Sequence, residues 1–408
     1  MGKFEPVSLV SCESYKYDTI RKALSESLSL IDGLSFVKPG MKVGIKTNLV
    51  SGNAPEKAVT THPLVLKCLC EMLREKGASV VIGDSPGGLY TQGFVRGVYK
   101  ASGLMDLESS FRDGDSTSGD GAVSLNWDFS VKDGEFPEAV SLKSFSYTGW
   151  LDEVDAIINV SKLKTHAMMG MSCAVKNMFG TIPGATKPEY HMRFPEEKAF
   201  ANVMVDLNEY FKPVLYVVDA IDGMEGNGPT AGEKRHIGAL LASKKPYALD
   251  MVCADIIGME LKDVATLAAA QVRGLGPNSV DEVDVVGSLA LGDAKISDFK
   301  RATIHQSITF EGGGIVNTLK SAAIKFVFYA RPGVKRNECI GCRKCYETCP
   351  AKAISMVDSR NKNGADGRIP KIDRSKCIKC FCCQEFCPVG AMKVHHNPIG
   401  TFVNKIQK

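Results

Sequence analysis

Two cysteine-rich runs near the C-terminus carry the clearest chemistry in this chain. Each run has four cysteines, separated by two, two and three residues, and a proline follows the last cysteine. Three thiolates at this spacing can surround one iron–sulfur cubane, while the fourth reaches a cubane held mainly by the other run. We therefore expect two 4Fe-4S clusters. The first is bound by Cys339, Cys342, Cys345 and Cys387, and the second by Cys377, Cys380, Cys383 and Cys349.

Zinc sites and structural disulfides are the alternatives to this interpretation. Zinc would be expected to use one pair of cysteines per half-site, without the crowded third and fourth cysteines. A disulfide scaffold would need an export signal, and the first residues contain no apolar segment of that kind. We therefore expect a cytoplasmic protein. Cys382 is expected to pack beside a cluster, and five scattered cysteines are expected to be buried thiols: Cys12, Cys68, Cys70, Cys173 and Cys253.

The two runs resemble those of bacterial two-cluster ferredoxins, and the C-terminal region is strongly basic. Residues 335–408 contain 15 Lys/Arg and 6 Asp/Glu, a net charge of +9, whereas the whole chain carries +4. Two oxidised clusters with their thiolates would remove about four charges and leave the region basic. An acidic electron carrier, a flavodoxin or a small ferredoxin, is the predicted partner. A solvated or intramolecular face is the alternative, and nucleic acid is disfavoured because no nucleic-acid motif accompanies the charge.

The rest of the chain predicts a larger α/β domain. A hydrophobic content of 44% and a charged content of 24% are typical of a globular protein, and no apolar stretch is long enough to span a membrane. Short apolar strands alternate with helical patterns, which favours a mostly parallel sheet. The expected strands are 7–12, 42–46, 78–83, 156–160, 214–219 and 238–243, and the expected helices are 17–30, 63–75, 200–211 and 249–259.

Polar residues follow several of these strands, and ligands of parallel sheets bind beyond the carboxyl ends of strands. Asn48 follows the second strand, and Asp84 opens a Gly-containing turn after the third. The densest segment, residues 159–180, is expected to begin as a strand and to become a helix near Gly170. It contains Lys164, His166, Lys176 and Asn177. Asp219 and Asp222 lie in an acidic, glycine-rich segment that favours a substrate loop, a plain turn or a hard-cation site.

These residues predict a site for a small anion. Lys164, Lys176 and Asn177 are suited to bind a carboxylate or phosphate, and His166, Asp84 or Asp219 could transfer protons. We assign catalytic roles to His166, Lys164, Lys176 and Asp219, and substrate contacts to Asn48, Asp84, Asn177 and Asp222.

Several of these motifs carry a family resemblance. The chain resembles the domain of unknown function 362 family over residues 5–295, and the Thr61-His62-Pro63 helix start is also similar to lactate racemase-like N-terminal domains. The family resemblance implies an iron–sulfur protein with a role in anaerobic redox metabolism. The motifs that carry it lie in residues 61–63, 83–86, 162–166, 176–180 and 219–229.

We expect four regions and weigh two functions. The α/β domain covers residues 1–300, a linker with a packing helix 301–334, a small α+β dicluster ferredoxin-like domain 335–396, and a tail 397–408. The first function is an oxidoreductase that passes electrons from a carrier through the clusters to an anionic substrate. The alternative is a non-catalytic electron-transfer or assembly subunit for a partner redox enzyme. An enzyme should gather the candidate residues in one pocket, whereas a carrier should leave them dispersed or paired with each other.

Overall fold

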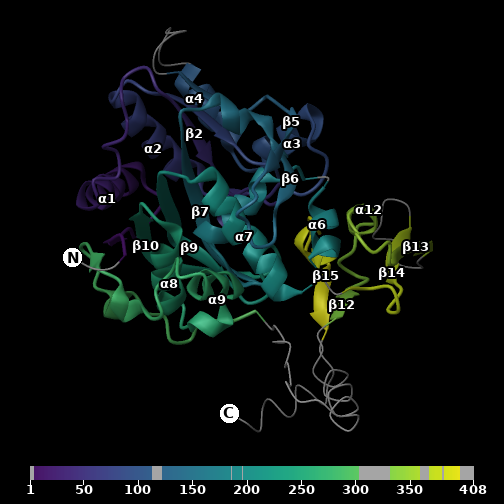
Figure 1. Cartoon of the computed structure of the whole chain (residues 1–408). Helices are drawn as coiled ribbons and strands as arrows, with labels where there is room; N and C mark the ends of the chain where they lie inside the picture. The colour runs from purple at the N-terminus through teal and green to yellow at the C-terminus, as the bar shows by residue number, and fades with distance from the viewer. Residues whose placement is uncertain are drawn as a thin grey trace.

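A mixed, nine-stranded sheet forms the centre of the larger part of the chain (Figure 1). The computed structural model describes residues 4–112, 122–184, 186–194, 196–302, 331–358, 367–378 and 381–395. Within these residues the strand order is β11-β1-β10-β9-β7-β2-β3-β4, and β8 pairs with β7. The strands are β1 Val7–Ser11, β2 Lys42–Lys46, β3 Ser79–Gly83, β4 Val123–Leu125, β7 Ala156–His166, β8 Gly170–Ser172, β9 Leu215–Glu225, β10 Glu233–Ser243 and β11 Val285–Val286.

The sheet is mostly parallel where the candidate site was predicted. The ladders β9-β7, β7-β2, β2-β3 and β3-β4 are all parallel, whereas β10 runs antiparallel to both β1 and β9. The carboxyl ends of five parallel strands, β9, β7, β2, β3 and β4, therefore lie at one edge of the sheet, as an α/β fold requires. The predicted fold class is confirmed.

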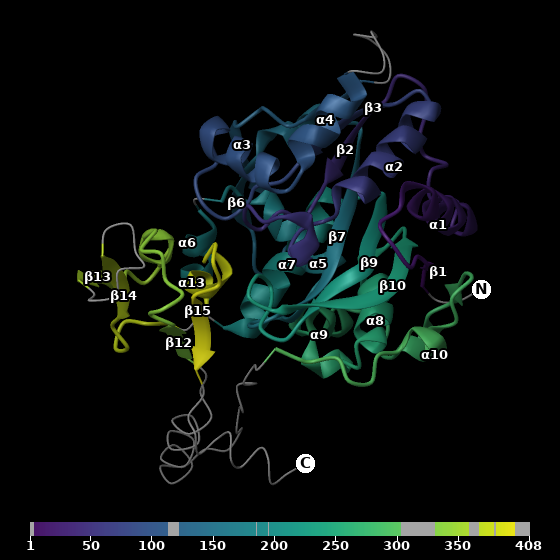
Figure 2. The ribbon, with the colours of Figure 1, turned by 180° about the vertical axis from the view of Figure 1, so that it is seen from behind.

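Helices cover both faces of this sheet (Figures 1 and 2). One core contains the apolar sides of α1 to α4 together with Val43, Ile45 and Val80, and the other contains those of α8 and α9 with Leu163 and Val218. The described helices of this part are α1 Tyr17–Leu30, α2 Pro63–Glu75, α3 Gln92–Ala101, α4 Leu104–Arg112, α5 Ala174–Asn177, α6 Lys187–Arg193, α7 Glu197–Phe211, α8 Pro246–Ile256, α9 Ala265–Val272 and α10 Leu291–Ala294. A separate hairpin joins β5 Val131–Glu135 and β6 Ser144–Thr148.

Three strands are longer than the sequence predicted, and one of them is β10, which begins at Glu233 instead of residue 238. β7 continues through Lys162 and Lys164 to His166, and β9 continues past Asp219 to Glu225. The prediction of a helix near Gly170 was wrong. Gly170, at φ +77°, begins β8, which folds back on β7, and α5 begins only at Ala174. The left-handed backbone conformation needed in this turn suits glycine and excludes a continuing helix.

The small C-terminal part has two similar halves, one for each cysteine run. Strand β12 pairs with β15, β13 pairs with β14, and a one-turn helix begins within each cysteine run. The bounds are β12 Arg331–Val334, α12 Lys344–Glu347, β13 Ile354–Asp358, β14 Arg368–Ile372, α13 Cys382–Glu385 and β15 Met392–His395.

The domain boundaries predicted from the sequence stay predictions. The expected packing helix at 315–330 and the tail at 397–408 lie outside the described residues. None of the helices that the structure describes is long and apolar enough to cross a membrane.

Candidate functional site

The four cysteines predicted for the first cluster line one cavity. Cys339, Cys342, Cys345 and Cys387 surround a space of about 320 Å³, and apolar side chains such as Val334 complete its wall. The last cysteine of the second run has thus joined the first three of the first run. This is the exchange that a two-cluster ferredoxin requires.

A second cavity of about 320 Å³ contains the complementary set. Cys349, Cys377 and Cys383 line it together with apolar residues that include Ile354 and Ile372. The fourth predicted ligand, Cys380, lies outside the described residues. Both cavities combine converging thiols with apolar walls, so the donor set and its surroundings fit 4Fe-4S clusters.

Backbone groups approach the crossing cysteines in both halves. The Ala353 N–H donates to Cys349 Sγ at 3.3 Å, and the Ala391 N–H donates to Cys387 Sγ at 3.2 Å. Such hydrogen bonds to ligand sulfurs stabilise their negative charge and raise a cluster's reduction potential. Burial and the neighbouring cysteine charges raise the pKa of Cys345 to about 12 in the metal-free protein, so iron must displace its proton.

A small pocket lies at the carboxyl ends of the parallel strands. Four predicted site residues line it: Asn48, Asp84, Lys176 and Asn177. Nine further residues line it, none of which was predicted as a site residue: Val50, Ser85, Gly87, Ser172, Phe179, Gly180, Lys187, Pro229 and Phe386.

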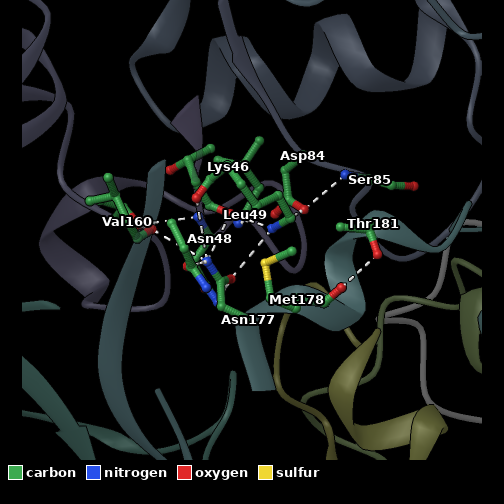
Figure 3. A network of polar contacts seen from close by, with 12 residues as sticks. Lys46, Asn48, Leu49, Asp84, Ser85, Val160, Asn177, Met178 and Thr181 are labelled. Atoms are coloured by element: carbon green, nitrogen blue, oxygen red, sulfur yellow. Dashed lines mark hydrogen bonds and ion pairs between the residues drawn. The ribbon is translucent and has the colours of Figure 1, made fainter. Parts of the chain in front are cut away.

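A buried polar network forms the floor of this pocket (Figure 3). Lys46 Nζ pairs with Asp84 Oδ1 at 2.7 Å, and Asp84 Oδ2 accepts the Leu49 N–H at 2.7 Å. Asn177 Oδ1 accepts from Asn48 Nδ2 at 2.8 Å, while Asn177 Nδ2 donates to Asn159 Oδ1 at 2.7 Å. Burial lowers the pKa of Lys46, and the Asp84 charge opposes that shift. These contacts hold the amide of Asn177 in one orientation.

Lys176 differs from the other lysines at this edge. It projects from α5, its Nζ lies 5.7 Å from the Phe179 ring centroid, and within the described residues its ammonium has neither an ion pair nor a hydrogen bond. The start of α5 is fixed by Asp250, whose carboxyl accepts the Ala174 and Val175 N–H groups at 2.8 and 3.0 Å. The pocket therefore contains the Lys176 ammonium, which has no countercharge within the described residues. Lys187, which also lines the pocket, donates to the Ser85 carbonyl.

Lys164 and His166 lie close by but do not line this pocket. Lys164 Nζ donates to Asn48 Oδ1 at 2.8 Å and to the Val59 carbonyl at 2.5 Å. His166 Nδ1 accepts the Met168 and Met169 N–H groups, both at 3.1 Å, so the neutral ring carries its proton on Nε2. Burial, followed by the charges of Lys176, His191 and Lys164, lowers the pKa of His166 well below 6.5. At neutral pH His166 can donate a hydrogen bond but is a poor base.

Asp219 and Asp222 lie on β9, which pairs with the edge of β7 opposite to β2, and both form contacts away from the pocket. Asp219 pairs with Lys162 at 3.0 Å, and Lys162 also donates to Tyr15 Oη at 2.6 Å. The Tyr15 ring stacks on His62 with centroids 3.8 Å apart. Asp222 instead contacts residues of β10, pairing with Lys234 at 3.3 Å and with His236 at 2.8 Å. The structure thus separates these carboxylates from the pocket.

The C-terminal part closes the pocket. Phe386, which directly precedes Cys387, lines the pocket and is buried against Gly87, where any larger side chain would collide with its ring. Gln384 donates to the Asn227 carbonyl at 3.0 Å, and its own carbonyl accepts from Thr230 Oγ1 at 3.2 Å. Phe386 lines the strand-end pocket, and the next residue, Cys387, lines the cavity of the first ligand set. The two spaces therefore lie next to each other.

Comparison with known sequences defines the family. A family model described as a domain of unknown function, DUF362, matches residues 43–255, more than half of the chain. The chain belongs to the DUF362 family. A 4Fe-4S dicluster domain model matches residues 338–391, which supports iron–sulfur clusters and electron transfer in this DUF362 protein.

The relatives place few limits on its chemistry. A thylakoid-associated protein of Synechocystis sp. is 32% identical over 283 residues, which cover 67% of this chain and 81% of that protein. The lactate racemase apoprotein of Thermoanaerobacterium thermosaccharolyticum aligns with a TM-score of 0.39 at 11% identity, over 62% of this chain and 57% of that one. A Thermotoga maritima protein aligns with a TM-score of 0.30 at 16% identity, over 54% of each chain.

Proposed function

We propose that this DUF362 protein is an iron–sulfur oxidoreductase that passes electrons from a soluble carrier, through two 4Fe-4S clusters, to a small anionic substrate. The observation that carries the proposal is the position of Phe386, which lines the strand-end pocket and precedes the cluster ligand Cys387. A bound 4Fe-4S cluster supplies single electrons. Fixing that donor beside the pocket removes the need for a separate encounter at each transfer.

The residues of the pocket favour an anion as its occupant. Lys176 would attract a carboxylate or oxoanion, since its charge is not compensated within the described residues. Asn48 and Asn177 would orient the ligand through their amides, which the buried network holds in place. Phe179 and Phe386 limit the space to a small molecule and exclude water from its apolar side.

Asp84 and His166 differ in what they could contribute to the site. Asp84 lines the pocket and is paired with Lys46, so its carboxylate can help to position a polar ligand. His166 does not line the pocket, and its low pKa argues against proton uptake by its ring. Lys164 would act through Asn48, which it contacts directly.

The alternative function, a non-catalytic electron-transfer or assembly subunit, is favoured by one observation. Lys162, Tyr15 and Asp219 satisfy one another in a buried cluster away from the pocket, which is the pairing expected of a structural unit. Under this alternative, the strand-end edge would hold the fold together and a partner enzyme would carry the chemistry. Asp219 would then have no catalytic role.

Reoxidation kinetics distinguish the two functions. The protein is reconstituted and reduced anaerobically, and its visible absorption is followed after addition of pools of small carboxylates and oxoanions. The oxidoreductase predicts that one pool reoxidises the protein. Lys176→Met should raise the pool concentration that gives half-maximal reoxidation roughly 10- to 100-fold, the loss of affinity expected for one charge-assisted contact. Lys198→Met, which changes an exposed lysine of α7, is the matched control.

Iron content must be equal in all three proteins for the comparison to hold. If no pool reoxidises the wild type while a partner redox protein does, the subunit function replaces the enzyme.

We also propose a cytoplasmic location and a role in anaerobic metabolism. Cell fractionation tests the location against the thylakoid association named for the Synechocystis relative.

A further inference from the structure

A second, larger hollow lies on the C-terminal part, between β12 and β14. It has a volume of about 480 Å³ and is lined by strand residues and by the segment after each strand. We call it the basic groove, because its four charged lining residues are all cations: Arg331, Arg336, Lys371 and Arg374. The pocket beside Phe386 and Gln384 shares none of its lining residues with this groove.

The charges of the basic groove are not neutralised within the described residues. All four cationic side chains are exposed, and none forms an ion pair there. Three acidic residues of this region have other partners: Glu338 pairs with Lys335, Asp358 pairs with Arg368, and Asp373 accepts hydrogen bonds from Ser375. A concentration of four like charges around one concave surface attracts an oppositely charged partner.

The floor of the basic groove is also the outer wall of both cluster-binding cavities. Pro332 and Ile372 line the groove and the cavity that contains Cys349, Cys377 and Cys383. Val334 and Pro370 line the groove and the cavity of the first ligand set. A protein seated in the groove would therefore be separated from each cavity by single apolar side chains.

We propose that the basic groove is the docking surface for a small acidic electron-carrier protein, whose carboxylates surround a cofactor close to its surface. This inference rests on the proposed electron-transfer function and specifies where the carrier binds. Cationic rims steer such encounters and fix their orientation, while an apolar centre brings the two redox sites close together. The partner, on this account, binds at a surface distinct from the substrate pocket.

Binding measurements with charge-reversed variants test the proposal. The cluster-loaded full-length protein is titrated with an oxidised, acidic bacterial ferredoxin, and the Kd is measured at low and at physiological ionic strength. Arg336→Glu, Lys371→Glu and Arg374→Glu should each weaken binding roughly 3- to 10-fold, and salt should weaken the wild-type complex. Lys198→Glu on α7 is the matched control and should bind like the wild type.

Iron content and visible absorption confirm that each variant is folded and loaded. Groove variants that bind the ferredoxin as tightly as the wild type overturn the proposal, whether the groove is then filled by another part of this chain or is simply solvated. A control that weakens binding as much as the groove variants also overturns it. Because the readout is binding, a failure here leaves substrate reoxidation intact, whereas a failure of the proposed function leaves ferredoxin binding unchanged.

Discussion

The contact between Gly87 and Phe386 gives the sharpest prediction about how the two parts of the chain fit together. A Cβ atom on Gly87 would meet only the Phe386 ring among its nearest neighbours. Gly87→Ala should therefore cost about 1–3 kcal/mol, the usual penalty of overpacking. Phe386→Ala removes a buried ring and should cost about 3–5 kcal/mol.

The double variant separates this contact from other effects. If the ring is the obstacle, Gly87→Ala adds nothing once Phe386 is alanine, so the coupling energy should be about −1 to −3 kcal/mol. Hydrogen exchange of the amides in residues 381–391 measures it. Gly87→Ala alone should accelerate exchange there roughly 5- to 150-fold, because every 1.4 kcal/mol is a factor of ten.

A matched substitution checks that alanine itself is harmless. Gly93 lies at the start of α3, and a Cβ atom added there would have no neighbouring atom within 4 Å, so Gly93→Ala should leave this exchange unchanged. Additive costs in the double variant, or normal exchange in Gly87→Ala, would refute the view that Phe386 holds the C-terminal part against the pocket.

Three further predictions concern the site and its support. Burial raises the pKa of Asp250 from 3.8 to about 7. Between about pH 4 and pH 7, Asp250 therefore keeps a proton in the folded protein that it releases in the unfolded chain. The free energy of unfolding is highest below about pH 4 and falls as the pH rises to 7. Relative to Asp250→Asn, the wild type should lose on the order of 4 kcal/mol of unfolding free energy over that range in denaturant titrations, and parallel pH profiles would contradict this. Gly180→Ala should destabilise the protein by about 3–5 kcal/mol, because its Cβ would collide with the buried Lys46–Asp84 pair. Gly97→Ala in α3 should not destabilise it, because a Cβ atom there would have no neighbour within 4 Å. Equal unfolding midpoints for the two variants would contradict this prediction. Cys382→Ala should keep the full iron content, and Cys345→Ala should lose about half of it, as metal analysis can decide.

The sequence was most informative where local patterns coincide with the fold. Three elements, 17–30, 42–46 and 63–75, have the predicted bounds in the structure, because alternating apolar periods and a proline at the first helical position define them locally. The cysteine spacing likewise predicted which thiols share a cavity. The ligand chemistry of such runs leaves few other arrangements.

The sequence was least informative where charges are buried. Lys162 and Lys164 are typical of an exposed strand end, yet both are almost fully buried within β7. Their partners, Asp219 and Asn48, are distant in sequence, so no local pattern could reveal the pairing. Only the assembled sheet brings these groups together and makes their burial tolerable.

The contact of the C-terminal part with the pocket was also missed. In the second cysteine run, Gln384 and Phe386 occupy the positions that Tyr346 and Thr348 occupy in the first. Comparing the two halves could have suggested that the second had acquired a separate role, because an aromatic ring at Phe386 replaces the hydroxyl of Thr348. In the structure Gln384 is buried, whereas its counterpart Tyr346 is half exposed. The surface on which Phe386 packs, however, is formed by Gly87 and is not visible in the repeat itself.

The measurement that tests the central claim most directly is the iron and acid-labile sulfide content of the anaerobically reconstituted protein, combined with spin-quantified EPR after reduction. The account predicts about eight irons and eight sulfides per chain and two interacting spins, since two sets of four cysteines would each hold a 4Fe-4S cluster. Zinc in place of iron, or iron far below that number, would contradict it.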